Sequence, residues 1–361
     1  MKKYFLSLLC LFAGVVLFTA CSDDDDDNKG GRPVEGQVVY EGLLILNEGQ
    51  YASHINGSLD YLDYRTNKVV RNVFSKVNGR SLGGTPNHAI VAEGKIFIAT
   101  TDENRVEILD AKTLVAATPV TVPQPRELCS HKGYVYVTSY NGTVTKISIA
   151  TGKAVATSAV IGDRLEGIVA ANNSLYVCNA FLPGDNYNYT YRTNVVKLNP
   201  ETLQKQKDIT VNANPNQILA IGSNVYVCSW GNYADAFELV QQIDANDQVT
   251  DIAPATYMAA AGSKLYLVAS PYYMTTYSVY DTTTATFSTL TMGSEIFMPY
   301  MIAADPKSGD IFISALKQDP DSGYGDYVGD ATVVRYKSDG TYVATYDCGT
   351  CPGTLLYVNN N

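Results

Sequence analysis

A short strand pattern, rich in hydrophobic residues, recurs along most of the chain. Every copy except the first carries a Phe or Tyr, and the copies are Leu43–Asn47, Lys95–Ala99, Tyr134–Thr138, Leu175–Asn179, Val225–Ser229, Leu265–Ala269 and Ile311–Ala315. Corresponding residues lie 39 to 53 positions apart. Repeats of about 40–50 residues that are built from strands are typical of β-propellers.

Each repeat has the same internal order of four strands. A strand of small or apolar residues such as Ala89–Ala92 precedes a tight turn, the aromatic strand, a polar-alternating strand such as Arg105–Asp110, and a fourth strand. Seven copies therefore predict an all-β fold over residues 40–361: a seven-bladed β-propeller of four-stranded blades. The first copy lacks a preceding strand, and Thr354–Val358 has the missing pattern. We expect this C-terminal strand to close the ring against the first blade.

The first 20 residues have the pattern of an export signal. Two lysines precede an apolar stretch from Phe5 to Leu17, which is too short to span a membrane as a helix. The five residues that end at Cys21 resemble a bacterial lipobox, in which Cys21 is lipidated and becomes the first residue of the mature chain. The alternative is an ordinary signal peptide in which this cysteine is incidental.

An acidic run follows the predicted lipid site. Asp23–Asp27 are five consecutive aspartates within residues 21–39, and a block of like charges stays extended, so we predict a solvated tether. The run also resembles the export signal of surface-exposed lipoproteins in some Gram-negative bacteria. The expected location is the outer surface of the outer membrane, with attachment through the Cys21 lipid.

Composition narrows the class of ligand. The formal net charge is −10 and the sequence pI is about 4.8, which argues against nucleic acid, because phosphates need a basic footprint. The chain has 27 tyrosines, 10 phenylalanines and one tryptophan. Tyrosine combines an apolar face with a polar tip, so this excess indicates an exposed binding surface.

One face of the predicted propeller gathers these aromatic residues. The loop before the first strand and the loop between the second and third strands of each blade lie on this face, which we call the rim face. Rigid aromatic area interleaved with amides suits a large amphipathic ligand, although we expect about half of the rings to cover blade ends. The candidate ligand-binding residues are Tyr51, Arg126, Tyr140, Arg164, Phe181, Tyr187, Trp230, Tyr233, Tyr257, Tyr272, Tyr273, Tyr300 and Tyr324.

Catalytic and metal-binding patterns are weak. The chain has three histidines, His54, His88 and His131, and no HExxH, GxSxG or phosphate-binding glycine motif. We expect no convergent set of acids or bases at the mouth of the channel, no resident cofactor or metal, and no enzymatic activity. The alternative for His54 or His88 is a role as axial metal ligand.

The cysteines fit an exported protein. The spacing of Cys348 and Cys351 favours a local disulfide over a redox centre, since no βαβ pattern surrounds them. A metal site would need further Cys or His residues nearby. Cys178 and Cys228 lie in apolar runs and are expected to be small buried residues.

Several segments resemble known families. The repeated LYV-type strands resemble the YncE-like seven-bladed propellers over nearly all of residues 40–361. Ile45–Gly49, Phe74–Arg80 and the lipobox with its aspartate run are similar to BtuG-type surface lipoproteins, which capture cobalamin beside a TonB-dependent outer-membrane transporter. This resemblance implies a non-enzymatic protein that binds cobalamin (vitamin B12) or related corrinoids very tightly and delivers them to such a transporter.

The predicted rim is compatible with a corrinoid, which is a broad disc with apolar faces, peripheral amides and one phosphate. Tyr and Trp would cover the disc, Asn and Gln would meet the amides, and Arg126 or Arg164 would meet the phosphate. One alternative is a surface propeller that binds a glycan or a protein partner, because exposed aromatics also suit sugar stacking. Another is an enzyme such as a propeller lyase or quinoprotein, which would need convergent acids or bases.

Overall fold

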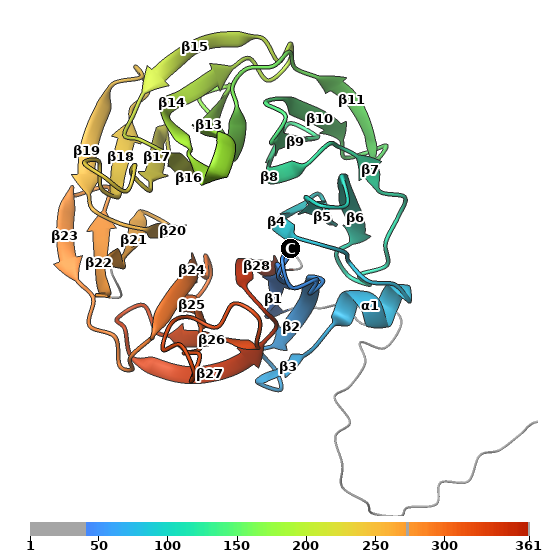
Figure 1. The fold of residues 1–361 in the computed structure, drawn as a ribbon, viewed down its shortest axis with the longest axis vertical. Helices are drawn as coiled ribbons and strands as arrows, with labels where there is room; N and C mark the ends of the chain where they lie inside the picture. The colour runs from blue at the N-terminus through green and yellow to red at the C-terminus, as the bar shows by residue number, and fades with distance from the viewer. Residues whose placement is uncertain (1–40, 272–273, 360–361) are drawn as a thin grey trace, which may run out of the picture. The chain divides into compact units, whose positions relative to one another are not determined.

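The computed structural model describes residues 41–271 and 274–359, which form seven four-stranded antiparallel sheets. The sheets are the blades of a ring, so the predicted seven-bladed propeller is confirmed (Figure 1). The named helices are short: α1 (Val73–Asn78) and the 3-10 turn η1 (Asp185–Tyr187). No helix within the described ranges is long and apolar enough to cross a membrane.

Each blade runs from an inner strand at the ring centre to an outer strand at its edge (Figure 1). The inner strands are β28 (Pro352–Asn359), β4 (Pro86–Ala92), β8 (Pro125–His131), β12 (Arg164–Ala171), β16 (Pro215–Ile221), β20 (Tyr257–Ala261) and β24 (Met298–Ala304), which define blades 1 to 7 in that order. The second strands are β1 (Glu41–Asn47), β5 (Lys95–Thr100), β9 (Tyr134–Ser139), β13 (Ser174–Leu182), β17 (Asn224–Ser229), β21 (Lys264–Ala269) and β25 (Ile311–Leu316).

The two outer positions of each blade complete the sheets. The third strands are β2 (Ser58–Asp63), β6 (Arg105–Asp110), β10 (Val144–Ser148), β14 (Thr190–Leu198), β18 (Leu239–Ile243), β22 (Thr276–Asp281) and β26 (Ala331–Tyr336). The outer strands are β3 (Lys68–Val70), β7 (Val120–Thr121), β11 (Lys153–Thr157), β15 (Lys205–Thr210), β19 (Val249–Ala253), β23 (Thr286–Thr289) and β27 (Tyr342–Cys348).

The C-terminal strand closes the ring, as the sequence predicted. Strand β28 pairs antiparallel with β1 from Glu41↔Asn359 to Asn47↔Pro352 and supplies the inner strand of blade 1. The first blade therefore contains both ends of the described chain. Backbone hydrogen bonds across this seam replace two exposed strand edges.

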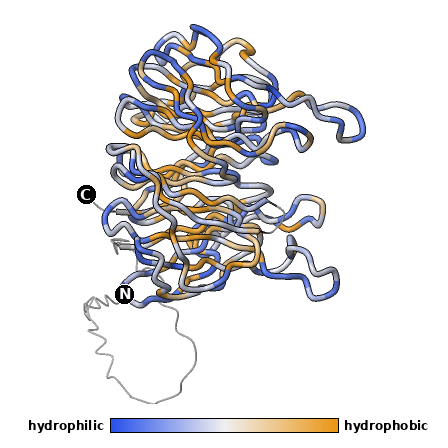
Figure 2. Tube along the Cα trace, turned by 90° about the vertical axis from the view of Figure 1, so that its left-hand side faces the viewer, coloured by the Kyte–Doolittle hydropathy of each residue, from blue (hydrophilic) through white to orange (hydrophobic). Residues whose placement is uncertain are grey.

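The aromatic residues of the second strands form much of the core between blades. Tyr136, Tyr176, Tyr226 and Tyr266 are at most 2% exposed, so burial of each ring contributes about 2–3 kcal/mol to folding. A buried tyrosine hydroxyl can still form a hydrogen bond with a neighbouring segment. The Tyr136 hydroxyl, for example, donates to the Pro200 carbonyl at 2.9 Å. Figure 2 shows that hydrophobic residues lie mainly in the strands inside the propeller, and that hydrophilic residues lie mainly in the loops at the ends of the blades. This packing explains why the repeat is visible in the sequence.

Six of the seven inner strands begin with a β-bulge on the rim face. The extra residue lies between paired positions, for example between Pro86↔Thr100 and His88↔Ala99 in β4. Comparable shifts occur in β8, β12, β16, β24 and β28. A bulge bends the strand and changes the direction of a side chain. Each of these inner strands can therefore direct an additional side chain toward the ring centre.

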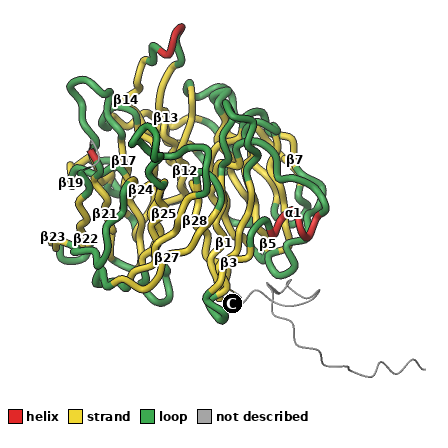
Figure 3. The backbone as a smooth tube through the Cα atoms, turned by 60° about the horizontal axis from the view of Figure 1, so that its bottom comes forward, coloured by secondary structure: helices red, strands yellow, loops and turns green. Residues whose placement is uncertain are grey.

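Blade 4 carries the longest hairpin on the rim face. Strands β13 and β14 are nine residues each, and η1 lies in the loop that joins them. Figure 3 shows this hairpin extending beyond the neighbouring loops, with a helical segment at its tip. It brings Phe181, Tyr189 and Tyr191 alongside the central cavity.

The expected disulfide between Cys348 and Cys351 is wrong, because both residues are free thiols. Cys348 ends the outer strand β27, and Cys351 lies just before the inner strand β28 with a φ of 52°. The chain passes between blades here, and the Cys351 thiol contacts the Tyr327 carbonyl oxygen at 3.6 Å. Both side chains pack in the same hydrophobic cluster between blades 7 and 1, without a bond between them. Cys178 and Cys228 are fully buried, as expected.

Candidate functional site

A cavity of about 410 Å³ lies where the inner strands begin on the rim face. Every blade contributes to its lining, so it lies at the centre of the ring. The lining residues that the following description uses are Glu48, Asn87, His88, Arg126, Glu127, Tyr140, Glu166, Phe181, Tyr189, Tyr191, Asn214, Gln217, Trp230, Tyr233, Tyr257, Tyr300 and Gly353.

The bulges at the inner strands supply much of this lining. Asn87, Asn216, Tyr300 and Gly353 are bulge residues in β4, β16, β24 and β28, and all four line the cavity. In β8 the bulge contains Arg126 and Glu127, and in β12 it contains Glu166. One repeated backbone feature therefore supplies the polar floor of the site.

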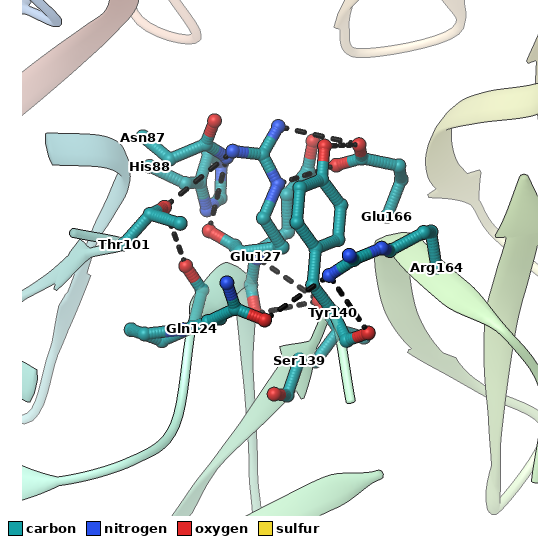
Figure 4. Close-up of polar contacts among 12 residues, drawn as sticks. Asn87, His88, Thr101, Gln124, Glu127, Ser139, Tyr140, Arg164 and Glu166 are labelled. Carbon is teal, nitrogen blue, oxygen red and sulfur yellow. Dashed lines mark hydrogen bonds and ion pairs between the residues drawn. The ribbon is translucent and has the colours of Figure 1, made fainter. Parts of the chain in front are cut away.

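Arg126 and Glu166 form the central ion pair of the cavity. The Arg126 Nε donates to Glu166 Oε2 at 2.9 Å, and Nη2 donates to Oε1 at 3.2 Å. The Tyr140 hydroxyl donates to the same Oε1 at 2.5 Å, a contact visible in Figure 4. Both charged side chains are largely buried, at 15% and 5% exposed. The charge of Arg126 is thus already neutralised, which alters the expectation that it meets a ligand phosphate.

Tyr140 lies between two guanidinium groups. Arg126 stacks over its ring at 4.3 Å from the centroid, and Arg164 stacks at 4.9 Å. Arg164 also donates to the Gln124 side chain at 3.0 Å and to the Tyr140 carbonyl at 3.2 Å, as Figure 4 shows. Among the described residues, Arg164 has no carboxylate partner. It is the arginine of the predicted pair that remains available to an anionic group.

Glu48 comes from the loop after β1 and reaches the cavity from blade 1. The Tyr300 hydroxyl donates to its Oε2 at 3.0 Å. A Cβ added at Gly353 would lie 1.9 Å from Oε1 of Glu48, so this glycine leaves room for the carboxyl group. Burial raises the pKa of Glu48 to about 7, although the nearby Arg126 opposes this shift.

Glu127 and His88 complete the set of titratable groups at the floor. Burial, with a contribution from the neighbouring Glu166, raises the pKa of Glu127 to about 8. His88 Nδ1 accepts a hydrogen bond from the Leu128 N–H at 3.2 Å, and burial lowers the His88 pKa to about 4. The histidine is therefore neutral near pH 7. The expectation of no convergent acids or bases at the channel mouth is wrong, because the bulges bring several together.

A continuous series of aromatic rings borders one side of the cavity, and we call it the aromatic ladder. Phe181 contacts Tyr140 at 6.1 Å and Tyr189 at 5.1 Å between ring centroids. Tyr191 continues the series at 6.3 Å from Tyr189 and reaches Tyr233 at 5.7 Å. Most of these contacts are edge-to-face, the favourable geometry for aromatic pairs. Tyr233 remains 72% exposed at the far end.

Trp230 and Tyr257 form a second aromatic pair at the cavity. Their rings meet edge-to-face at 6.4 Å, and the Trp230 indole N–H donates to the Thr256 carbonyl at 2.9 Å. The hydrogen bond fixes the orientation of the indole. Trp230 is the single tryptophan of the chain, so its fluorescence reports on this site alone.

Seven predicted site residues line the cavity: Arg126, Tyr140, Phe181, Trp230, Tyr233, Tyr257 and Tyr300. Tyr51 and Tyr324 lie in rim loops apart from the cavity and are 75% and 64% exposed. Tyr272 and Tyr273 lie outside the described residues, as do the side chain of Tyr187 and the lipid site Cys21. The structure thus brings together about half of the predicted set.

The sequence analysis missed Glu48, Glu127, Glu166 and His88 as a group. A usable signal precedes several inner strands, where a residue with positive φ comes directly before proline, as at Thr85, Gln124, Asn214 and Cys351. The residue after each proline lies in a bulge and lines the cavity. Alignment of these X-Pro pairs would have identified much of the floor.

Metal binding finds no support in the part of the chain that the structure describes. It contains no group of three or more His, Cys, Asp or Glu residues arranged to hold a metal ion. His54 lies in an exposed loop with a φ of 56°. His88 already accepts a backbone hydrogen bond through Nδ1.

A larger cavity of about 920 Å³ lies between the edges of blades 2 and 3. Its walls are mainly aliphatic side chains and backbone of residues 108–120 and 150–154. Strand β7 has only two residues here, and the rest of β6 is paired through an isolated bridge between Leu109 and Ala116. Its lining includes Lys95, Asp110 and Lys153 but no aromatic side chain, whereas the rim cavity combines charge, hydrogen bonding and aromatic area.

Solved structures with a similar fold come from proteins of diverse kinds. A quinoprotein alcohol dehydrogenase-like protein from Bacteroides thetaiotaomicron has a TM-score of 0.63 and 16% identity, with 90% of this chain and 79% of that chain covered. Hydrazine synthase from Kuenenia stuttgartiensis has a TM-score of 0.57 and 14% identity, with 74% and 88% covered. Apo AztD from Citrobacter koseri has a TM-score of 0.56 and 9% identity, with 88% and 97% covered.

These identities establish the propeller fold and nothing finer, because one fold hosts many functions. No curated protein matches the chain significantly. Residues 41–351 match the family described as Domain of unknown function (DUF5074). Because the match covers nearly all of the propeller, the chain belongs to the DUF5074 family.

Proposed function

We propose that this propeller is a non-enzymatic capture protein that binds cobalamin or a related corrinoid on its rim face. The observation that carries the proposal is the aromatic ladder from Tyr140 to Tyr233 beside a central cavity with a polar floor. A ligand with a broad apolar face and peripheral polar groups matches this combination. The resemblance to BtuG-type lipoproteins points to the same class.

The size of the cavity determines how such a ligand would bind. A volume of about 410 Å³ suits part of a corrinoid and is too small to enclose the whole molecule. The corrin disc would lie across the rim against the ladder, and one peripheral side chain would enter the cavity. Arg164, stacked on Tyr140, is the residue that would meet the phosphate.

A binding role fits the state of the polar groups better than catalysis does. Glu166 is already saturated by Arg126 and Tyr140. Among the described residues, Glu48 and Glu127 have no cation in contact, and no Ser, Thr, Cys or Lys side chain of the lining is hydrogen-bonded to either carboxyl group. Preformed rings and fixed side chains lose little entropy when a rigid ligand binds, which favours high affinity.

We further propose that a lipid on Cys21 holds the protein at the outer face of the outer membrane. The aspartates 23–27 would act as an extended tether that keeps the rim accessible. A TonB-dependent transporter is the proposed recipient of the ligand. The resemblance to the BtuG type and the order of lipobox and acidic run support this part of the proposal.

A thermal-shift experiment tests the ligand class. Saturating cyanocobalamin should raise the melting temperature, because a ligand that binds only the folded state stabilises it by RT ln(1 + [L]/Kd). A panel of oligosaccharides tests the alternative of sugar stacking on the same rings. A shift with glycans and none with cyanocobalamin would replace the corrinoid with a carbohydrate.

A further inference from the structure

Several hydrogen-bond donors around the rim cavity are already used by the protein. Arg126 and the Tyr140 hydroxyl donate to Glu166, and the Tyr300 hydroxyl donates to Glu48. The other committed donors are Trp230 Nε1 to the Thr256 carbonyl at 2.9 Å, Asn87 Nδ2 to the Arg126 carbonyl at 3.1 Å, and Gln217 Nε2 to the Met301 sulfur at 3.4 Å. These donors are therefore engaged within the protein before a ligand enters.

Acceptors in the same cavity remain free. Among the described residues, the Glu127 carboxyl group has no hydrogen-bond or ion-pair partner, and Glu48 Oε1 has none. Asn214 gives an independent indication, because it is only 4% exposed, it lines the cavity, and its Oδ1 has no partner. A buried acceptor without a donor costs about 1–3 kcal/mol, so these groups favour a ligand that supplies N–H donors.

The charged groups of the lining also favour a ligand with N–H donors over an anion. The charged side chains are the carboxyl groups of Glu48, Glu127 and Glu166 and the guanidinium of Arg126, and His88 is neutral through its Nδ1 hydrogen bond. Because Arg126 offsets Glu166, the carboxyl groups of Glu48 and Glu127 have no counter-charge in the lining. Where they are ionised, an entering anion meets a net negative charge, whereas a cation stabilises the carboxylates.

We propose that the rim cavity binds a nitrogen group that carries several N–H donors, such as an amidinium cation or a primary amide, and that it excludes anions. The amide form of this statement rests on the proposed function, since corrinoid side chains end in primary amides. The cationic form of the proposal is independent of the proposed function. Aromatic walls from Tyr140, Tyr257 and Tyr300 suit both forms, because a planar N–H group stacks well on such rings.

The titration of the two carboxyl groups supports this geometry. Burial raises the pKa values of Glu48 to about 7 and of Glu127 to about 8. Arg126 opposes both shifts and Glu166 adds to both, so the facing charges come from blades 3 and 4. A cation bound beside either carboxyl group would lower its pKa and stabilise the carboxylate.

Three probes of nearly identical shape test the proposal on the purified protein: benzamidinium (cation), benzamide (neutral donor) and benzoate (anion). Binding is followed by the fluorescence of Trp230 and, independently, by titration calorimetry. Benzamidinium should bind most tightly, benzamide more weakly and benzoate least. Equal or tighter binding of benzoate would overturn the proposal, and so would the absence of binding by all three probes in both measurements.

Two variants test whether the Glu127 carboxyl group is responsible for benzamidinium binding. Glu127→Gln keeps the shape of the side chain and should weaken benzamidinium binding about tenfold, with a smaller effect on benzamide. Glu93→Gln, in the exposed turn between β4 and β5 on the opposite face, is the matched control and should bind like wild type. Thermal melts confirm that each variant is folded. Unchanged benzamidinium affinity in folded Glu127→Gln would show that this carboxyl group is not the anchor.

A parallel titration with cyanocobalamin separates the two proposals. Selective benzamidinium binding without corrinoid binding would retain the cavity assignment and reject the corrinoid as ligand. Corrinoid binding combined with a preference for benzoate would retain the corrinoid as ligand and reject the cavity assignment.

Discussion

Arg126 and Glu166 form a bidentate ion pair that joins blades 3 and 4 at the floor of the rim cavity, with N–O distances of 2.9 and 3.2 Å. The two residues are 40 positions apart and come from bulges at equivalent places in β8 and β12. Tyr140 adds a third contact to the carboxylate. The pair therefore fixes the floor of the site and the contact between two blades.

Removal of Glu166 should destabilise the protein strongly. Glu166→Gln leaves the largely buried Arg126 without its counter-charge, and broken buried pairs typically cost about 3–5 kcal/mol. We expect the free energy of unfolding to fall by about 3 kcal/mol in urea titrations. The exposed pair of Lys317 and Asp347 provides the control, since Lys317→Ala should cost less than about 1 kcal/mol. Equal losses in the two variants would contradict the structural importance of the buried pair.

Stability should fall as pH rises through neutrality. Glu127 has a folded pKa of about 8 against an ordinary value of 4.5, so between these values the folded state holds more protons than the unfolded state. His88 acts in the opposite direction, but only between about pH 4 and 6.5. From pH 6.5 to 8, wild type should lose stability relative to Glu127→Gln by up to about 1.4 kcal/mol per pH unit. Parallel pH profiles of the two proteins would show that Glu127 titrates normally.

The closing strand should be essential for the whole ring. Leu356 of β28 pairs with Leu44 of β1, and proline at this position has no backbone N–H and fixes φ at a value unlike that of an antiparallel strand. Leu356→Pro should lower the melting temperature substantially and increase cleavage by proteases, while Leu356→Val keeps the strand and should melt near wild type. A Leu356→Pro variant as stable as wild type would contradict closure by this strand.

The five cysteines of the described residues should all be thiols. Burial raises the pKa of Cys351 to about 11 and the pKa of Cys348 well above its ordinary value, so both should react slowly in the folded protein. Alkylation after unfolding, without a reductant, should label both residues, as read by mass spectrometry. A peptide with a Cys348–Cys351 disulfide would contradict this assignment.

The fold was predictable because its main packing unit repeats locally. Tyr136, Tyr176 and Tyr226 lie at the same place in three successive blades and are buried between them, so the sequence repeats their pattern. The rim face followed from the alternation of loops within a blade. Aromatic residues of the cavity, including Phe181 of the ladder and Trp230 of the second pair, were therefore assigned to the correct face.

The polar floor was not predictable in the same way. Its members Glu48, Glu127 and Glu166 come from three blades. Glu127 and Glu166 reach the cavity from bulges, which leave no strong mark in the hydrophobic pattern, and Glu48 reaches it from a loop. The neutral state of His88 depends on its burial and on the backbone hydrogen bond to Nδ1, which exist only in the folded protein. The incorrect Cys348–Cys351 disulfide arose because short spacing alone does not determine side-chain direction.

Calorimetric titration with cyanocobalamin, performed on wild type and on Phe181→Ala, tests the central claim most directly. Phe181 lies within the aromatic ladder between Tyr140 and Tyr189, so its loss should remove contact area for the disc. Tyr342→Ala, on the outer strand β27, is the control for loss of a partly exposed ring. We predict one-to-one binding to wild type and the control, and at least about tenfold weaker binding to Phe181→Ala. No heat of binding at several temperatures, or equal affinity in all three proteins, would contradict corrinoid capture on the aromatic ladder.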